Sequence, residues 1–284
     1  MIQQTLEQAL ILTPVAEGVL SADLHGDFSN GPVSQPPEAG FPFGGLLAAL
    51  SASAMRTGLD VRGPLRTLSV QYLAAARYGE RLDFAPRLLR GGRSAAFAQV
   101  EASQGGRLTN HATATYGADV PGPALTPLIL PPPPLAGLDP KAQLGGPMMP
   151  RFAQHVEYRF DGGPHILSGR DGASAIERVW MRIGDGRALD EIALCYLLDA
   201  LYPPVWTALT RPVAMSTVDL RYDFLTDASP ETAPDGWAFF EFRMLDFGLG
   251  WTVDEATAWG VDGTPLAIAR QRRKLAPQRS PAEG

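Results

Sequence analysis

Polar side chains stand at three points of this sequence where the surrounding residues are apolar. Asp199 lies within DEIALCYLLDALYPPVW (residues 190–206), Thr217 within VAMSTVDLRYDF and Gln271 within PLAIARQRRKL. A carboxyl group shielded from water can serve as an acid or a base, and a hydroxyl and an amide can donate and accept hydrogen bonds. The three residues therefore offer parts of an active site, provided that the fold brings them together.

The stretch over residues 190–206 predicts a buried helix that begins at Asp190 and ends at the prolines after Tyr202. Apolar residues occupy all of its faces, Asp190 and Glu191 suit its first turn, and Pro203-Pro204 stops it. A buried carboxylate without a partner costs several kcal/mol. We therefore expect Asp199 either to have hydrogen-bond partners within the protein or to take part in its function. The alternative is a structural aspartate that bonds to a neighbouring strand.

The other two residues also have plain structural explanations. Thr217 is a strand former, and strict alternation places it on the same face of its strand as Asp219. Gln271 lies at the start of the basic end of its strand, where its side chain could simply contact water. Taken together, however, the three residues offer a carboxylate, a hydroxyl and an amide from one helix and two strands.

Other kinds of active site find no support in the sequence. It contains no G-x-x-x-x-G-K-[ST] phosphate loop, no G-x-G-x-x-G turn between a strand and a helix, and no G-x-S-x-G nucleophile elbow. The four histidines lack metal-ligand spacing, and the single cysteine, Cys195, lies in the apolar helix, where burial raises a thiol pKa. We therefore expect no metal, no cofactor and no cysteine nucleophile.

The composition is typical of a globular chain. Apolar residues make up 45% of the 284 residues and charged residues 19%. The net charge is −6 and Arg270 to Lys274 form the one basic run, so nucleic acid is not expected as a partner. The start, MIQQTLEQAL, lacks the features of a signal peptide, and no apolar run reaches the length of a membrane span. We expect a cytoplasmic protein that does not enter the membrane.

The order of predicted elements repeats once along the chain. A small-residue helix over 44–58 precedes alternating strands over 65–116, and the helix from residue 190 precedes strands over 212–275. Ten prolines between Pro121 and Pro150 indicate a semi-rigid connector. The patterns predict two α+β units, residues 1–117 and 151–284, joined by a connector over 118–150; each unit packs a helix on an antiparallel sheet.

Several short motifs together resemble those of the TesB-like acyl-CoA thioesterases, which are bacterial double hotdog proteins. The shared features are an F-G-G helix start, an R-x-G-x-S…V…Q-x-G strand pair, an Asp on the second helix, a T-x-D strand and a Gln near the end. In this chain they are Phe43-Gly44-Gly45, Arg90 to Ser94 with Val100, Gln104 and Gly106, Leu198-Asp199, Thr217-Val218-Asp219, and Ala269-Arg270-Gln271. The resemblance covers residues 15–117 and 150–275.

This resemblance implies a double hotdog fold and hydrolysis of an acyl-CoA thioester to a carboxylic acid and CoA, an activity of fatty acid metabolism. Asp199 would then act as the general base, while Thr217 and Gln271 hold the attacking water. The helix start at Gly44-Gly45 would offer N–H groups to the oxyanion. We expect the two sheets to join edge to edge, because that removes two exposed edges.

The basic run near the C-terminus is our candidate for contacts with the CoA phosphates. It contains Arg270, Arg272 and Arg273, and the alternative is a solvated strand end. The chain departs from the family in having Ala200 where a His often follows the Asp, in lacking His in LSVQYLAAARYG, and in its long connector. These departures bear on the acyl group that the protein accepts.

Two other functions suit the same fold. A hotdog hydratase or dehydratase pairs a His with an acid, and His25 is the histidine within reach of the first helix, through the loop of residues 25–43. A non-catalytic acyl-CoA-binding protein would bind the ligand without turnover. Acyl-CoA is the expected partner in each case, and pairing into a homo-oligomer, a dimer or larger, is a further expectation.

Overall fold

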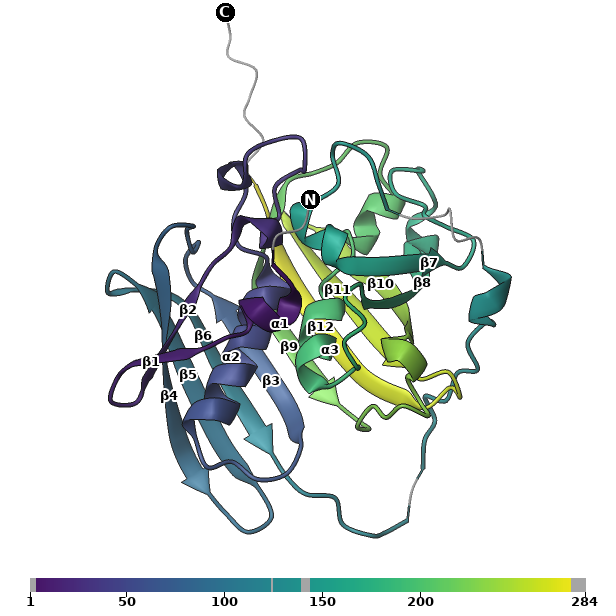
Figure 1. Ribbon diagram of the computed structural model, residues 1–284. Helices are drawn as coiled ribbons and strands as arrows, with labels where there is room; N and C mark the ends of the chain where they lie inside the picture. The colour runs from purple at the N-terminus through teal and green to yellow at the C-terminus, as the bar shows by residue number, and fades with distance from the viewer. Residues whose placement is uncertain (1–3, 124, 139–143, 277–284) are drawn as a thin grey trace, which may run out of the picture.

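A computed structural model describes residues 4–123, 125–138 and 144–276 (Figure 1). Residues 1–3, 124, 139–143 and 277–284 lie outside the described residues, and with them the ends of both predicted units and part of the predicted connector. Three α-helices occur in the described ranges: α1 (Leu6–Ala9), α2 (Gly44–Gly58) and α3 (Glu191–Leu197).

The strands of the described ranges form one antiparallel sheet in the order β1-β2-β4-β5-β6-β3-β9-β12-β11-β10-β8-β7. The strands of the first half are β1 (Thr13–Ala16), β2 (Val19–Asp23), β3 (Leu65–Tyr72), β4 (Arg81–Gly91), β5 (Ala96–Gln104) and β6 (Arg107–Tyr116). Those of the second half are β7 (Val156–Phe160), β8 (Ile176–Ile183), β9 (Met215–Phe224), β10 (Ala238–Gly248), β11 (Trp251–Trp259) and β12 (Pro265–Leu275).

The two halves of the sheet meet where β3 pairs with β9. Leu68 lies opposite Tyr222 and Val70 opposite Leu220, and all four side chains are buried. The expected edge-to-edge junction is therefore confirmed, and it removes one open edge from each half. The boundaries of the two units at residues 117 and 151 stay a proposal.

Helices α2 and α3 lie side by side on one face of this sheet (Figure 1). The residues Leu46 to Ala52 of α2 are all buried, because the helix is covered by the sheet on one side and by α3 on the other. Its alanine, serine and glycine residues permit this close packing, as small side chains let backbones approach. The inner strand faces alternate accordingly: Ala96, Ala98, Val100 and Ala102 of β5 are buried, and the residues between them are more exposed.

The second helix is shorter than predicted. We expected it to extend from Asp190 to the prolines after Tyr202, but α3 ends at Leu197, and Asp199 lies in the turn that follows. The turn is tightened by bonds of the 3₁₀ type, from the Asp199 N–H to the Tyr196 carbonyl and from the Ala200 N–H to the Leu197 carbonyl. Pro203 and Pro204 then open a separate 3₁₀ turn.

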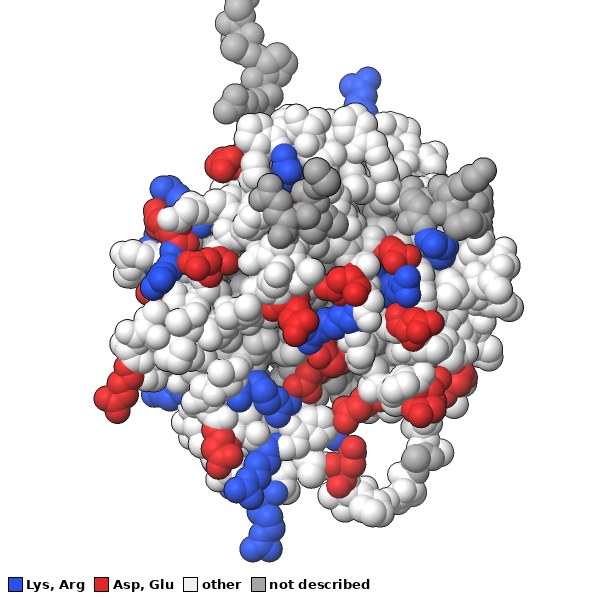
Figure 2. Space-filling view, viewed as in Figure 1, with Lys and Arg blue, Asp and Glu red and all other residues white. Residues whose placement is uncertain are grey.

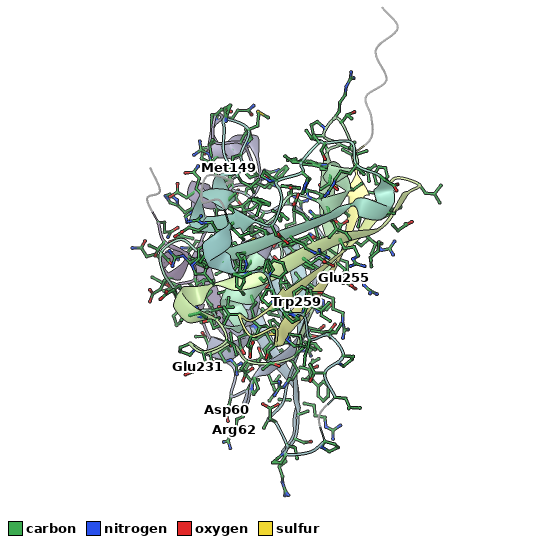
Figure 3. The ribbon with its side chains drawn as sticks, turned by 90° about the vertical axis from the view of Figure 1, so that its right-hand side faces the viewer. Asp60, Arg62, Met149, Glu231, Glu255 and Trp259 are labelled. Atoms are coloured by element: carbon green, nitrogen blue, oxygen red, sulfur yellow. The ribbon has the colours of Figure 1, made fainter. Side chains whose placement is uncertain are left out.

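The proline-rich connector packs against the opposite face of the sheet in addition to joining the halves. A second apolar cluster there is formed by Trp180, Trp237, Phe239 and Trp259, and Leu130, Leu135 and Leu138 of the connector cover it. The indole N–H groups of Trp180 and Trp259 donate to the carbonyls of Pro133 and Leu128 at 3.0 and 2.7 Å. Figure 3 looks onto this side of the molecule and labels Trp259.

Candidate active site

The structure brings the three residues singled out in the sequence into contact. The amide nitrogen of Gln271 lies 2.8 Å from Asp199 Oδ1 and 2.5 Å from Thr217 Oγ1. Gln271 comes from β12, Thr217 from the neighbouring β9, and Asp199 from the turn after α3. Asp199 and Gln271 are only 6% and 5% exposed. A carboxyl, an amide and a hydroxyl thus form a bonded cluster, in which the carboxyl and the amide are buried and the hydroxyl is half-buried.

An irregularity in β9 turns Thr217 toward this cluster. Arg273 of β12 lies opposite Thr217, whereas the preceding Arg272 lies opposite Asp219, so Val218 is an extra residue in the pairing. Our expectation that Thr217 and Asp219 share a face is therefore wrong. The bulge at Val218 places Thr217 on the inner face with Gln271 and places Asp219 on the outer face with Arg272.

Tyrosine hydroxyls hold the turn that carries Asp199. The last carbonyls of a helix lack partners within the helix. Here Tyr222 of β9 donates to the carbonyl of Cys195 at 2.8 Å, and Tyr158 of β7 donates to the carbonyl of Ala200 at 2.7 Å. The backbone on both sides of Asp199 is therefore attached to the sheet by buried hydrogen bonds.

The start of α2 faces the same carboxyl group. The N–H of Gly45 lies against Asp199 and lowers its pKa. A Cβ atom at Gly44 would lie 3.0 Å from Asp199 Oδ2, and a Cβ atom at Gly45 would lie 2.9 Å from the carbonyl oxygen of Tyr196. The Gly44-Gly45 helix start thus faces the aspartate of the other half, and at Gly45 a larger residue would meet the backbone oxygen of Tyr196.

Burial raises the pKa of Asp199 above its ordinary value of 3.8. Arg273, the Gln271 amide and the Gly45 N–H act in the opposite direction, and the nearby carboxyl group of Asp254 adds to the increase. Asp254 of β11 is itself buried, and its own pKa is raised by that burial. Two buried acids therefore share the single guanidinium of Arg273, which lies 2.9 Å from Asp254 and 3.7 Å from Asp199.

The arginine cluster predicted for CoA phosphates is divided between the two faces of β12. Arg273 points inward, its side chain is only 13% exposed, and it is paired with Asp254 and Asp199. Arg270 points outward and pairs with Glu255 at 2.6 Å. The prediction is wrong in grouping Arg273 with the others, because alternation along a strand separates adjacent side chains. A phosphate role for Arg270 and Arg272 on the outer face stays a proposal.

Tyr72 at the end of β3 is a neighbour of the site that the sequence did not single out. Its hydroxyl donates to the carbonyl of Gly44 at 2.8 Å. Burial raises the pKa of this phenol well above its usual value, and the Asp199 carboxyl adds to the increase. The inward alternation of Leu68, Val70 and Tyr72 could have identified it, had the position of β3 beside β9 been known.

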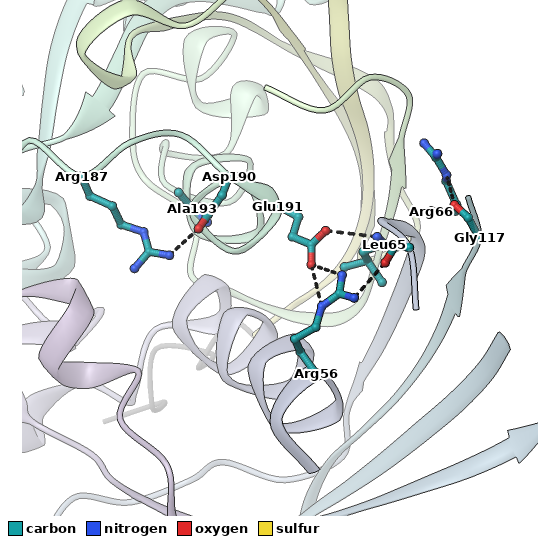
Figure 4. Close-up of polar contacts among 9 residues, drawn as sticks. Arg56, Leu65, Arg66, Gly117, Arg187, Asp190, Glu191 and Ala193 are labelled. Carbon is teal, nitrogen blue, oxygen red and sulfur yellow. Dashed lines mark hydrogen bonds and ion pairs between the residues drawn. The ribbon is translucent and has the colours of Figure 1, made fainter. Parts of the chain in front are cut away.

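The other end of the helix pair is occupied by an ion pair (Figure 4). Arg56 of α2 donates from Nε to Glu191 Oε1 at 3.2 Å and from Nη1 to the carbonyl of Gly63 at 2.8 Å. Glu191 in turn accepts the N–H of Leu65 at 3.1 Å. These bonds join the start of α3 to α2 and β3. The described contacts therefore make this end a structural junction.

Two further histidines, His25 and His165, lie in loops and bond to neighbouring groups there. His25 accepts the N–H of Asp27 and caps a short 3₁₀ turn. The buried Glu177 accepts the N–H of His165 at 2.8 Å and contacts its ring nitrogen at 2.9 Å, beside a pocket of about 250 Å³. Both contacts attach the loop around His165 to β8. Within the described residues, no group of three or more His, Cys, Asp and Glu side chains is placed to hold a metal ion.

The charged side chains are mixed on the face shown in Figure 2, where Lys and Arg alternate with Asp and Glu instead of forming one basic surface.

Among the helices of the described ranges, none has the length and apolar character needed to cross a membrane.

Two family models match the chain. The model of the acyl-CoA thioesterase N-terminal domain matches residues 32–117, and that of the C-terminal domain matches residues 127–272. The chain belongs to the acyl-CoA thioesterase family. Membership supports thioester hydrolysis at the level of the family and acyl-CoA as the ligand. A comparison with curated proteins found no match.

Solved structures share the acyl-CoA thioesterase fold over nearly the whole chain. A hotdog-fold protein of unknown function from Alicyclobacillus acidocaldarius is 23% identical, with a TM-score of 0.83 and coverage of 98% of this chain and 100% of that one. A putative thioesterase II from Thermobifida fusca is 19% identical, with a TM-score of 0.80 and coverage of 98% and 100%. The tesB protein of Mycobacterium avium subs. paratuberculosis is 18% identical, with a TM-score of 0.75 and coverage of 96% and 98%. The predicted TesB-like family and α+β double hotdog fold are confirmed.

Proposed function

We propose that this protein hydrolyses acyl-CoA thioesters with a water molecule activated by Asp199 and held by Thr217 and Gln271. The observation that supports the proposal most strongly is the contact of the three side chains, which come from three separate segments of the chain. Asp199 and Gln271 are buried and Thr217 is half-buried. Such a cluster costs free energy in a protein core unless it is used or fully paired.

The arrangement suggests how the reaction proceeds. The ionised carboxyl group of Asp199 takes a proton from water while the water oxygen attacks the thioester carbonyl carbon, which gives a tetrahedral oxyanion. The N–H of Gly45 is engaged by Asp199, so the other N–H groups at the start of α2 stabilise that oxyanion. When the C–S bond breaks, the thiolate of CoA receives the proton from Asp199, and the free carboxylic acid remains.

Gln271 and Thr217 have distinct parts in this proposal. The Gln271 amide donates to both Asp199 Oδ1 and Thr217 Oγ1. Because the Thr217 oxygen accepts that bond, its own hydroxyl proton points elsewhere and can hold the water or the carbonyl oxygen. The Gln271 bond also lowers the pKa of Asp199, which keeps more of the base ionised.

The decisive experiment measures release of free thiol from a panel of acyl-CoAs, from short to long chains and including aromatic acyl groups. Asp199→Asn is expected to lower kcat by about 10²- to 10⁴-fold, the usual loss when a general base is removed. Asp223→Asn is the matched control, because Asp223 is an acid on the outer face of β9 that pairs with Arg221. Equal turnover in wild type and Asp199→Asn would contradict the proposal.

The same variants separate the other two functions when hydration of an enoyl-CoA is measured beside thiol release. A hydratase or dehydratase would lose its hydration activity in His25→Ala and keep it in Asp199→Asn. A binding protein would retain acyl-CoA without releasing thiol. Assembly into a homo-oligomer also stays a proposal, which sedimentation velocity of the purified protein can test.

A further inference from the structure

We infer that Arg273, held in place by Asp254, is a positioning residue that sets the orientation of the Gln271 amide and so aligns Asp199 and Thr217. The inference rests on the proposed function and adds two residues to it. Neither residue needs to contact the substrate. Their role is to act through Gln271 and Asp199.

The contacts of Arg273 join the outer part of the cluster to its centre. Its Nη2 donates to Gln271 Oε1, and its Nε donates to Asp254 Oδ2 at 2.9 Å. The other oxygen of Asp254 accepts the hydroxyl of Thr252 at 3.0 Å. Thr252 is fully buried and Asp254 is 3% exposed. The guanidinium is therefore fixed on one side by a buried carboxyl group and presents its other side to the glutamine.

This geometry determines which end of the glutamine amide faces the base. A guanidinium can only donate hydrogen bonds, so the amide atom beside Arg273 must be the oxygen. The amide nitrogen then faces Asp199 and Thr217, where two acceptors are available. Without Arg273 the amide oxygen of Gln271 would lose its donor, and only the bonds to Asp199 and Thr217 would hold the amide. The amide would then be less firmly oriented although all three proposed catalytic side chains were present.

Arg273 and Asp254 also act on Asp199 with opposite signs. Arg273 favours the ionised carboxyl group and Asp254 disfavours it. Within the described ranges, Tyr72 of β3, Tyr196 of α3 and Tyr222 of β9 also interact electrostatically with Asp199. Phenols with raised pKa values stay neutral near pH 7, so the opposing charges that act on the base come from Arg273 and Asp254.

The experiment compares pH profiles of kcat and kcat/KM for Arg273→Met, Arg273→Lys and Asp254→Asn with wild type. Arg273→Met should lower kcat by about 10- to 100-fold, because small misplacements of reacting groups have effects of this size. It should also move the acid limb, the fall of the rate at low pH, to higher pH. Asp254→Asn should move the acid limb to lower pH. Arg273→Lys should leave the limb near its wild-type position but keep kcat low, because an ammonium group lacks the planar fork that bridges Asp254 and Gln271.

A merely structural role would not shift the acid limb in opposite directions. Thermal unfolding of each variant identifies any loss of fold, and the charge-retaining Arg273→Lys protects the test if Arg273→Met unfolds. The inference would be overturned if both Arg273→Lys and Asp254→Asn kept the wild-type pH profile and the wild-type kcat. If Asp199→Asn were inactive in the same experiment, the proposed function would remain intact.

Failure of the proposed function gives a different result, namely no thiol release by wild type. The carboxyl titration of Asp199 can then be followed by ¹³C NMR in the same variants. Opposite shifts of that titration in Arg273→Met and Asp254→Asn would support the coupling without any turnover, and equal titrations would contradict it.

Discussion

At the scale of single residues, the chemistry depends on one carboxyl group whose surroundings oppose its charge. Burial raises the pKa of Asp199, while Arg273, Gln271 and the Gly45 N–H limit the increase. A base with a raised pKa binds its proton more tightly, which makes it a better proton acceptor, as long as it is ionised at the working pH.

The pH dependence of kcat/KM follows from this pKa. We expect kcat/KM to fall on the acid side as Asp199 becomes protonated, with a midpoint above the ordinary aspartate value of 3.8. Initial rates of thiol release in buffers of constant ionic strength give the profile. A midpoint at or below the ordinary value would show that another group is the base.

Stability should respond to the same group with a predictable sign. Because the folded pKa of Asp199 is raised, its contribution to stability is fully present below the unfolded pKa and is lost as pH rises through the folded pKa. Asp199→Asn should therefore raise the melting temperature relative to wild type more at pH 8 than at pH 4. Calorimetry at both values tests this, with Asp223→Asn as control. A destabilised variant at pH 8 would mean that the Asn cannot reproduce the bonds of the carboxyl group.

At the scale of elements, the site depends on the close approach of the α2 start to the turn after α3. A Cβ atom at Gly45 would lie 2.6 Å from the Phe43 ring and 2.9 Å from the backbone oxygen of Tyr196. Gly45→Ala should thus cost about 1–3 kcal/mol of stability, although alanine is the better helix former. Urea denaturation measures the loss, and Ser53→Ala within α2 is the control. An unchanged or increased stability would show that the two segments can separate cheaply.

The tyrosine that caps the end of α3 allows a matched pair of substitutions. Tyr222→Phe leaves the Cys195 carbonyl buried without its partner and should cost about 1–3 kcal/mol. Among the described residues, the buried hydroxyl of Tyr116 has no hydrogen-bond partner, so Tyr116→Phe should be neutral or stabilising. Equal changes in the free energy of unfolding for the two substitutions, measured by urea denaturation, would show that Tyr222 does not act as a cap.

At the scale of the whole molecule, the β3–β9 junction makes one sheet of the two halves. All five tryptophans lie in the second half, so tryptophan fluorescence reports on that half, whereas far-ultraviolet circular dichroism reports on both. We expect the two probes to give the same unfolding curve in urea. Leu220→Ala at the junction, where the side chain is fully buried, should shift both curves together by about 2–5 kcal/mol. Separate transitions would mean that the halves unfold independently.

Sequence patterns alone determined the class of fold and the identity of the candidate residues. Alternation predicted most of the strands, the repeated order of elements indicated two units, and apolar surroundings singled out Asp199, Thr217 and Gln271. These properties are local, because periodicity and burial act on neighbouring residues.

Only the tertiary structure decided how those residues meet. Pairing between strands that are distant in sequence determines three features of the site. They are the bulge at Val218, the inward orientation of the Arg273 side chain and the position of Tyr72. An inserted residue reverses the face of every residue beyond it, and a period of two along one strand does not reveal which partner it will oppose. For the same reason, the packing of the connector on Trp180 and Trp259 became apparent only when the sheet was assembled.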